Sequence, residues 1–283
     1  MLIFSGLAVY YLELKNQSSI EFNVCLHYWD YNNDTLSFFD DLRVKWVRTD
    51  WLLIPEMMNY SKTLQENNKN LLTIIDINTF FPDKNVSLIN WKKNVTEIVL
   101  SDGFKYVNAV EIWNEPNAEA YLESDIYFEM LKSAYSIIKN HSDVEVVFAG
   151  VSPNVAWKDY LLDIFSNHDV ADFFDVMGIH LYDDSETNLE TLNFVKNLTN
   201  KSIWVTETGC PSYIETEDKC DEALQADYLS AFYNDIYPLV DKVFLYELID
   251  ASGLDPKKEN YFGLLTVNGT KKEAYHRIWE IVR

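Results

Sequence analysis

The stretch YVNAVEIWNEPNAEAYLESDIYFEMLKSAYSIIK, residues 106–139, contains the two patterns that recur along this chain. Its first part, residues 106–113, is a short apolar run rich in β-prone side chains, and turn-forming residues follow it directly. In its second part, residues 125–139, apolar side chains return every three or four positions, which is typical of an amphipathic helix packed on a core. The stretch therefore predicts one buried strand followed by one helix.

The same alternation of apolar runs and helical spacing continues in both directions from this stretch. The predicted strands cover residues 20–26, 45–48, 71–77, 106–113, 145–149, 176–179, 203–206 and 243–246. The clearest predicted helices cover residues 87–100, 125–139, 221–237 and 272–281. Strands that alternate with helices pair in parallel, and eight such units in about 260 residues predict an α/β fold of the (β/α)8 TIM barrel type.

An open doubly wound sheet is the alternative fold for alternating strands and helices. It would bind a nucleotide, but no Gly-rich phosphate loop follows the first predicted strand, and the chain has only eight glycines. With 283 residues, of which 48% are apolar, the chain can bury a large core. We therefore expect one barrel domain over residues 20–283, with no linker inside it.

Residues 1–19 form a separate N-terminal segment. Residues 1–12 are apolar, but they lack the basic residues and the small-residue cleavage site of an intact signal peptide. They are also too few for a membrane span, which needs roughly 20 residues. The segment is either the stub of a trimmed signal or an additional strand over residues 7–14, and we expect no membrane span.

The charge of the chain excludes some partners. Its formal net charge of −22 repels the phosphate backbone, so we expect no nucleic-acid partner, and anionic lipid is disfavoured for the same reason. Eight Asn-x-Ser/Thr sequons begin at Asn16, Asn33, Asn59, Asn85, Asn94, Asn197, Asn200 and Asn268. Their number favours an exported glycoprotein, extracellular or at the cell surface, whereas the alternative is chance in an Asn-rich chain.

The three cysteines and five histidines do not form a metal-binding pattern. No Cys/His cluster has the spacing of a zinc site, so we expect neither a metal nor a cofactor. Cys210 and Cys220 bracket a short loop after the seventh predicted strand, a spacing that allows a disulfide in an oxidising compartment. Cys25 would then be left as a packed core residue.

Two glutamates follow the ends of predicted strands. Glu115 lies in Trp113-Asn114-Glu115-Pro116 after the fourth strand, and Glu207 lies in Thr206-Glu207-Thr208-Gly209 at the end of the seventh. In a parallel barrel both strand ends open on the same face, so both carboxyl groups reach one central mouth. One acid can then protonate a departing oxygen while the other, ionised, attacks an anomeric carbon. Glu111 is expected to point into the barrel and to pair structurally.

These motifs resemble the acid/base and nucleophile motifs of clan A glycoside hydrolases, most closely the family 39 and family 5 types. Arg48 in Trp46-Val47-Arg48-Thr49-Asp50-Trp51 and the segment His180-Leu181-Tyr182 match further features of the clan. The resemblance therefore covers nearly the whole chain. One departure is Leu245-Tyr246-Glu247-Leu248, where the family often has a tryptophan that supports the sugar.

The resemblance implies a role for each matching residue. Glu115 would be the general acid/base and Glu207 the nucleophile, with Asn114 bonded to the sugar 2-hydroxyl. Arg48 would hold Glu207 ionised, Tyr182 would donate to Glu207, and His180 would brace this network. Further sugar contacts are expected from strand-end residues, namely His27, Trp29, Asp50, Trp51 and Tyr246.

The sequence thus predicts a monomeric retaining glycoside hydrolase that cleaves β-glycosidic bonds in an extracellular oligosaccharide or polysaccharide by double displacement. One alternative is an inverting hydrolase, which would hold its two carboxyl groups farther apart. The other is a surface glycoprotein that keeps the barrel and binds carbohydrate without turnover.

Overall fold

The computed structural model describes residues 20–32, 34–51, 54–76, 87–118, 122–153, 156–213, 220–254 and 257–283. Residues 1–19, for which a signal stub or an extra strand is expected, lie outside this part. The strands are β1 (Phe22–Cys25), β2 (Val44–Asp50), β3 (Asn70–Ile75), β4 (Ala109–Ile112), β5 (Glu145–Phe148), β6 (Val176–His180), β7 (Ser202–Thr208) and β8 (Lys242–Leu245). The α-helices are α2 (Thr35–Asp41), α3 (Pro55–Glu66), α5 (Leu88–Val99), α6 (Ser124–His141), α7 (Trp157–Asn167), α8 (Ser185–Leu198), α9 (Glu222–Asp235) and α10 (Glu273–Ile281).

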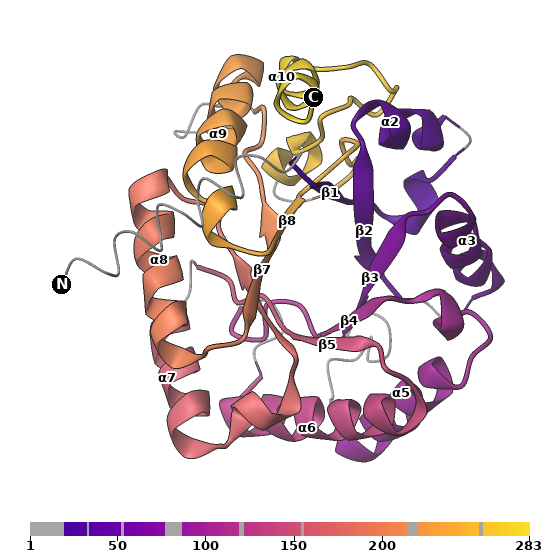
Figure 1. The fold of residues 1–283 in the computed structure, drawn as a ribbon, viewed down its shortest axis with the longest axis vertical. Helices are drawn as coiled ribbons and strands as arrows, with labels where there is room; N and C mark the ends of the chain where they lie inside the picture. Colours follow the sequence, from indigo (N-terminus) through magenta and orange to yellow (C-terminus); the bar gives the residue numbers. More distant parts are fainter. Residues whose placement is uncertain are drawn as a thin grey trace.

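Each strand pairs in parallel with the next strand in the sequence, and β8 pairs with β1, so the sheet closes into a barrel. Figure 1 looks along the barrel and shows the strands in the centre with the helices in a ring around them. Within the described residues one α-helix follows each strand. This arrangement confirms the predicted (β/α)8 TIM barrel.

The fourth strand is shorter than its apolar run predicts. It begins at Ala109, whereas Tyr106 ends a short 3-10 helix, η2 (Phe104–Tyr106). Phe104 is buried, with its ring centroid 6.4 Å from that of Trp51. The apolar character of the run therefore comes partly from a packed turn, which hydrophobicity alone does not distinguish from a strand.

Alternation along the strands separates two cores. On β2, Val47 faces the surrounding helices, whereas its neighbour Trp46 packs inside the barrel. The interior cluster of buried side chains comprises Cys25, Trp46, Leu72, Ala109, Val147, Val176, Trp204 and Phe244. Near the start of the strands, Trp46 and Trp204 meet edge to face at 5.3 Å, with Nζ of Lys242 within 5 Å of both rings. These side chains fill the interior of the barrel near the start of the strands.

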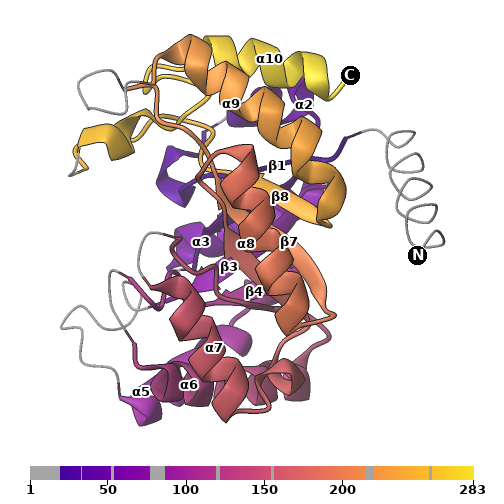
Figure 2. The same cartoon turned by 90° about the vertical axis from the view of Figure 1, so that its left-hand side faces the viewer.

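The larger core lies between the sheet and the helices, as expected for helices with one apolar stripe. In Figure 2, the view turned by 90°, α7, α8 and α9 lie on the outer side of the barrel. Among the described helices, none combines the length and the apolarity that a bilayer span requires.

Candidate active site

Arg48 lies at the centre of a polar layer inside the barrel, towards the carboxyl ends of the strands. Its side chain is 2% exposed. Nε donates to Glu111 Oε2 at 2.6 Å, Nη1 donates to Glu207 Oε1 at 2.6 Å, and Nη2 donates to Asn114 Oδ1 at 2.9 Å. One guanidinium therefore ties together the ends of β2, β4 and β7.

Glu111 is fully buried and makes the structural pairing expected for it. In addition to its bond with Arg48, Oε1 accepts hydrogen bonds from Gly150 N at 2.9 Å and Thr206 Oγ1 at 3.0 Å. A Cβ at Gly150 would overlap the imidazole ring of His180, so only glycine allows this close approach. With both oxygens satisfied, Glu111 acts as a fixed anion beneath the cavity.

Glu207 reaches the cavity because the pairing of β7 is irregular. The register shifts between Ile179 and His180 on β6, which places His180 opposite Glu207. A β-bulge of this kind re-aims a side chain out of the simple inward and outward alternation. Oε2 of Glu207 accepts a hydrogen bond of 2.7 Å from the hydroxyl of Tyr182, and Oε1 is held by Arg48.

Glu115 follows β4 on a backbone that turns sharply. Trp113 and Glu115 both have positive φ, 77° and 43°, a conformation that costs energy for non-glycine residues and recurs at functional sites. The amide of Glu115 donates to Gly150 O at 3.0 Å, which fixes this turn against β5. Its Oε1 lies 2.9 Å from Nδ1 of His180.

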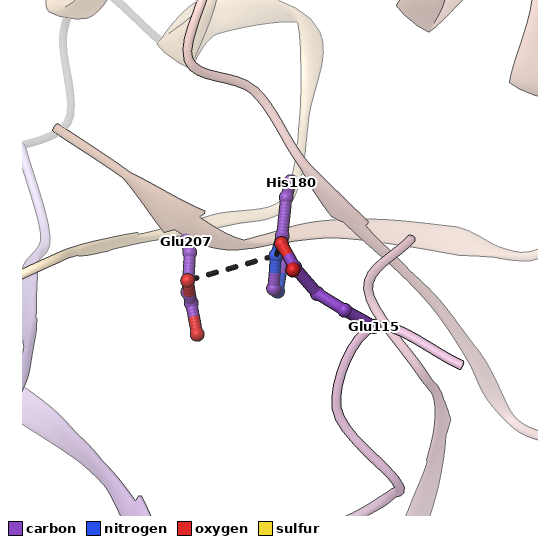
Figure 3. A group of neighbouring side chains, drawn as sticks. All are labelled: Glu115, His180 and Glu207. Carbon is purple, nitrogen blue, oxygen red and sulfur yellow. Dashed lines mark hydrogen bonds and ion pairs between the residues drawn. The ribbon is translucent and has the colours of Figure 1, made fainter. Parts of the chain in front are cut away.

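The structure brings Glu115, His180 and Glu207 together at the carboxyl ends of β4, β6 and β7. One carboxyl oxygen of each glutamate and a ring nitrogen of His180 all lie within 4.8 Å of one another. Figure 3 shows His180 between the two glutamates, with an interaction drawn from its ring to Glu207. This interaction joins Nδ1 to Glu207 Oε2 at 3.6 Å.

Charges and hydrogen bonds determine the protonation of this group. Burial raises the pKa of Glu207, but the charges of His180 and Arg48 and the Tyr182 hydroxyl outweigh it and hold that pKa below the usual carboxyl range. Burial lowers the pKa of His180, yet the neighbouring Glu207 and Glu115 raise it above its ordinary value. Burial and the charge of Glu207 raise the pKa of Tyr182 well above its ordinary value. At neutral pH Glu207 is therefore an anion, and Tyr182 remains a donor.

Among the described residues, Glu115, His180 and Glu207 are also the group whose ligand atoms are close enough together to hold a metal ion. Those atoms already bind one another, Arg48 and Tyr182. The arrangement suits two carboxyl groups that act on one ligand.

A cavity of about 1090 Å³ opens above this group. Most of the residues predicted for the site line it, namely His27, Arg48, Asp50, Asn114, Glu115, Tyr182, Glu207 and Tyr246. His180 lies beneath the cavity and is buried. A volume of this size accommodates more than one sugar ring.

Two of the residues predicted to contact the sugar are not among those that line the described cavity. Trp51 is 2% exposed and packs on Phe104 outside the cavity, because its side chain follows the outward alternation of β2. Trp29 is 57% exposed and does not line the cavity. Its ring stacks on His27 at 4.4 Å with an interplanar angle of 7°, so it supports a residue that lines the cavity.

Glu247 is a lining residue that sequence reasoning missed. It follows β8 after a cis peptide bond between Tyr246 and Glu247, and it is 1% exposed. Its Oε2 lies 3.7 Å from Nε2 of His27. The sequence does place a carboxylate at the end of the eighth predicted strand, and the same kind of position identified Glu115 and Glu207.

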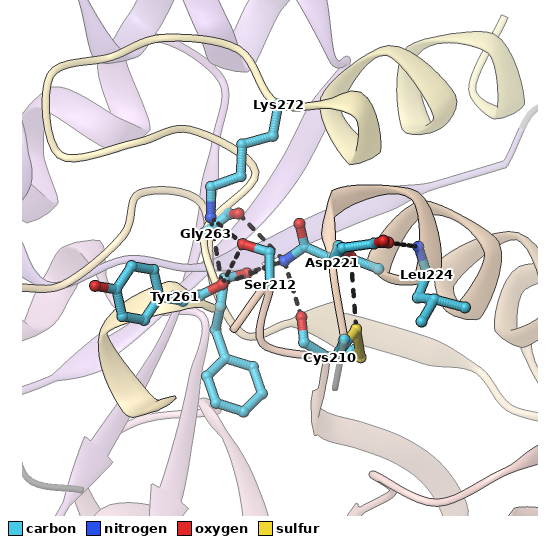
Figure 4. Close-up of a disulfide and its surroundings, with 10 residues drawn as sticks. Cys210, Ser212, Asp221, Leu224, Tyr261, Gly263 and Lys272 are labelled. Carbon is cyan, nitrogen blue, oxygen red and sulfur yellow. Dashed lines mark hydrogen bonds between the residues drawn. A yellow bond between two sulfur atoms is a disulfide. The ribbon is translucent and has the colours of Figure 1, made fainter. Parts of the chain in front are cut away.

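Cys210 and Cys220 are joined in a disulfide, and both line the cavity. Cys25 is a free, buried thiol. Figure 4 shows the polar network around the disulfide. In it, Nε2 of Gln225 donates to the carbonyl oxygens of Cys210 at 2.8 Å and Phe262 at 3.1 Å. Cys210 and the segment after β8 are thus tied to α9.

Phe262 connects this network to the polar layer. Its ring packs edge to face on Tyr182, at 5.9 Å, and on Tyr246, at 5.4 Å. Nearby, Nζ of Lys272 donates to Asp250 Oδ1 at 2.5 Å and to Ser212 Oγ at 2.9 Å. These contacts hold two aromatic walls of the cavity in place.

Residues 26–244 match the sequence family described as the glycosyl hydrolase catalytic core. No curated protein matches the sequence. Among solved structures, a family 39 glycoside hydrolase from the gut symbiont Bacteroides cellulosilyticus WH2 superposes with a TM-score of 0.73 and 18% identity. The match covers 93% of this chain and 63% of that one.

Two further similar structures are larger enzymes. A GH2 β-galacturonidase from Eisenbergiella tayi has a TM-score of 0.68 and 14% identity, covering 92% of this chain and 50% of that chain. A β-glucuronidase from Ruminococcus gnavus, in complex with uronic deoxynojirimycin, has a TM-score of 0.68 and 13% identity, covering 92% and 49%. At these identities the likeness shows a shared fold, and the chain spans about half the length of these two proteins.

Proposed function

We propose that this chain, which belongs to the glycosyl hydrolase catalytic core family, hydrolyses β-glycosidic bonds with retention of configuration. Membership of this family agrees with the resemblance to glycoside hydrolases predicted from the sequence. One observation carries the proposal: a carboxyl oxygen of Glu115 and a carboxyl oxygen of Glu207 lie within 4.8 Å of each other beside one cavity. Retaining enzymes hold their two carboxyl groups about 5 to 5.5 Å apart, and inverting enzymes about 6.5 to 9.5 Å apart, so this spacing favours retention.

In the first step Glu115 donates a proton to the departing oxygen while Glu207 attacks the anomeric carbon. Attack needs an ionised nucleophile, and Arg48 and Tyr182 provide the charge and the hydrogen bond that keep Glu207 in that form. The bond from carbon to the leaving oxygen breaks as the ester bond to Glu207 forms. The proton of Glu115 leaves with the alcohol.

In the second step Glu115, now ionised, takes a proton from water, and the water oxygen attacks the anomeric carbon as the bond from that carbon to Glu207 breaks and frees the carboxylate. The sugar then leaves with the configuration it had in the substrate. His180, 2.9 Å from Glu115, stabilises the carboxylate that exists between the two steps. Esterification of Glu207 removes its negative charge, which eases this ionisation.

Asn114 supports the proposal because its amide can bind the 2-hydroxyl of the sugar. Its Oδ1 accepts from Arg48 at 2.9 Å, which orients the amide so that Nδ2 is turned away from the guanidinium. An amide donor beside the nucleophile can bond the 2-hydroxyl, a contact that strengthens as positive charge develops on the ring.

We also propose that the protein is exported and acts as a monomer without a cofactor. Its substrate would be an extracellular or cell-surface oligosaccharide or polysaccharide. Five of the sequon asparagines lie in the described residues, and each is exposed or partly exposed: Asn59, Asn94, Asn197, Asn200 and Asn268. Such positions are accessible to glycosylation, and a disulfide fits an oxidising compartment.

A mechanism-based label tests the proposal. A 2-fluoro glycosyl fluoride slows the second step more than the first, so an ester accumulates on the nucleophile, and peptide mass spectrometry locates it. Labelling at Glu207, absent from the Glu207→Gln variant, is expected. The first product seen by NMR should be the β-anomer. Sugar binding with neither label nor product would identify a carbohydrate-binding protein, and an α-anomeric first product would identify an inverting enzyme.

A further inference from the structure

We infer that His27, Asp50 and Glu247 form a subsite that binds hydroxyl groups of an uncharged sugar and excludes uronic acids. The inference rests on the proposed glycosidase function and names the substrate class of the same cavity. All three residues line that cavity, at the ends of β1, β2 and β8.

The three side chains form a row with the imidazole in the middle. Nδ1 of His27 lies 3.6 Å from Asp50 Oδ2, and Nε2 lies 3.7 Å from Glu247 Oε2. Trp29 stacks on the imidazole and fixes its plane. Both ring nitrogens thus face carboxyl groups at slightly more than hydrogen-bond distance, which leaves these groups able to bind a ligand as well.

Glu247 provides the clearest sign that this row binds a ligand. It is 1% exposed, and within the described part of the chain its Oε1 has no hydrogen-bond partner. An unsatisfied buried oxygen costs free energy, and native structures usually satisfy such atoms with a partner, a water or a ligand. A sugar hydroxyl in the cavity would supply that partner.

The charge balance of the row suits an uncharged ligand. Burial raises the pKa of Glu247 to about 8, so at neutral pH this carboxyl is mainly protonated and can both donate and accept. Burial lowers the pKa of His27, but Asp50 and Glu247 raise it above the ordinary value, which favours the imidazolium. The imidazolium lies between the two carboxyl groups, so an ammonium group added beside it would be repelled.

A sugar carboxylate would meet buried cations that are already paired: in the described part of the cavity, His27 lies beside Asp50 and Glu247. Arg48 uses Nε, Nη1 and Nη2 on Glu111, Glu207 and Asn114. The other basic lining residues, Lys257 and Lys258, are exposed on η5 (Lys257–Tyr261). The burial that raises the pKa of Glu247 would penalise a sugar carboxylate beside it in the same way, and the charge of Glu207 would repel it.

Matched pairs of aryl β-glycosides that differ only at C6 test this inference. The pairs are glucoside with glucuronide and galactoside with galacturonide, supplemented by a xyloside, a mannoside and a 2-amino-2-deoxyglucoside. We expect the best uncharged substrate to exceed every uronide and the amino sugar at least 100-fold in kcat/KM. A uronide or an aminoglycoside that is cleaved better than the uncharged sugars overturns the inference.

Three variants assign the preference to this row. Glu247→Leu should lower kcat/KM on the uncharged substrate at least 30-fold. Glutamine can donate and accept as the protonated acid does, so kcat/KM of Glu247→Gln should be at least tenfold higher than that of Glu247→Leu. Asp50→Asn should lower the ratio of kcat/KM on the uncharged substrate to kcat/KM on the uronide at least tenfold. Asp183→Asn, which removes an exposed acid that lines the same cavity, should leave that ratio unchanged. Equal losses in Glu247→Leu and Glu247→Gln, or an unchanged ratio in Asp50→Asn, contradict the inference.

Binding separates this inference from the proposed reaction. Ligand-observed NMR with the Glu207→Gln variant compares methyl β-glycosides with the corresponding uronides, without any turnover. If no glycoside is hydrolysed by the wild type but the uncharged sugars still bind selectively, the proposed function fails and the subsite stands. If hydrolysis occurs and the uronides bind more tightly, the subsite fails and the function stands.

Discussion

The hydroxyl of Tyr182 donates to Oε2 of Glu207 at 2.7 Å, on the oxygen that Arg48 does not contact. The two donors hold the two oxygens of one carboxylate in different directions, which fixes the plane of the group in the cavity. The phenol comes from the loop after β6 and the guanidinium from β2, so the orientation of Glu207 depends on two separate segments of the barrel.

Replacing Tyr182 by phenylalanine should affect both rate and pH dependence. A hydrogen bond to a charged group contributes about 1.5 to 3 kcal/mol, so kcat/KM should fall roughly 10- to 150-fold. Because this bond lowers the pKa of Glu207, its loss should raise that pKa and move the acidic limb of the pH profile to higher pH. A profile of kcat/KM from pH 3 to 8 measures both effects. An acidic limb that stays in place would show that Tyr182 does not control this titration.

Replacing Glu115 by alanine should affect substrates according to their leaving groups. Removing a general acid costs about 10² to 10⁴ in rate on an alkyl glycoside, whose leaving oxygen needs a proton. A dinitrophenyl glycoside needs little protonation, so its first step should slow less than tenfold. Stopped-flow release of dinitrophenol measures that step. The Glu207→Ala variant is the control, since it should lose activity on both substrates. If Glu115→Ala lost equal activity on both substrates, Glu115 would not be the general acid.

Replacing Glu111 by glutamine should destabilise the fold. Breaking a buried ion pair costs about 3 to 5 kcal/mol, because Arg48 would keep its charge with less compensation. Urea unfolding measures the change in free energy of unfolding. Glu129→Gln is the matched control, because its pair with Lys132 is exposed on α6 and should contribute less than about 1 kcal/mol. A Glu111→Gln variant as stable as this control would contradict the structural role.

Replacing Glu247 by glutamine should stabilise the protein at high pH only. The folded pKa of about 8 lies above the ordinary value of 4.5, so the native state binds this proton more tightly than the unfolded state does. That contribution is complete below pH 4.5 and is lost as the pH rises through about 8. Glutamine does not titrate, so the free energy of unfolding of the variant should exceed that of the wild type by on the order of 3 kcal/mol at pH 7 to 8. Urea unfolding at pH 4.5 and pH 8 measures the difference, and an equal effect at both pH values would show that Glu247 does not titrate as its burial implies.

Much of the fold follows from local patterns in the sequence. The eight apolar runs correspond to β1 to β8, because a two-residue or 3.6-residue period records directly which face of an element is buried. The position of Glu115 and Glu207 on one face follows as well, since the carboxyl ends of all strands in a parallel barrel point the same way. His180 and Tyr182 were found only through resemblance to a known family.

Tertiary structure alone decided the contacts across the barrel. The row formed by His27, Asp50 and Glu247 joins residues from β1, β2 and β8, and no spacing in the sequence encodes that proximity. The assignment of Trp51 to the cavity failed because its position at a strand end does not show which way the side chain points. Local periodicity reports burial, whereas the distance between two side chains on different strands depends on strand register, on the bulge in β7 and on barrel closure. Those quantities exist only once the whole sheet has closed.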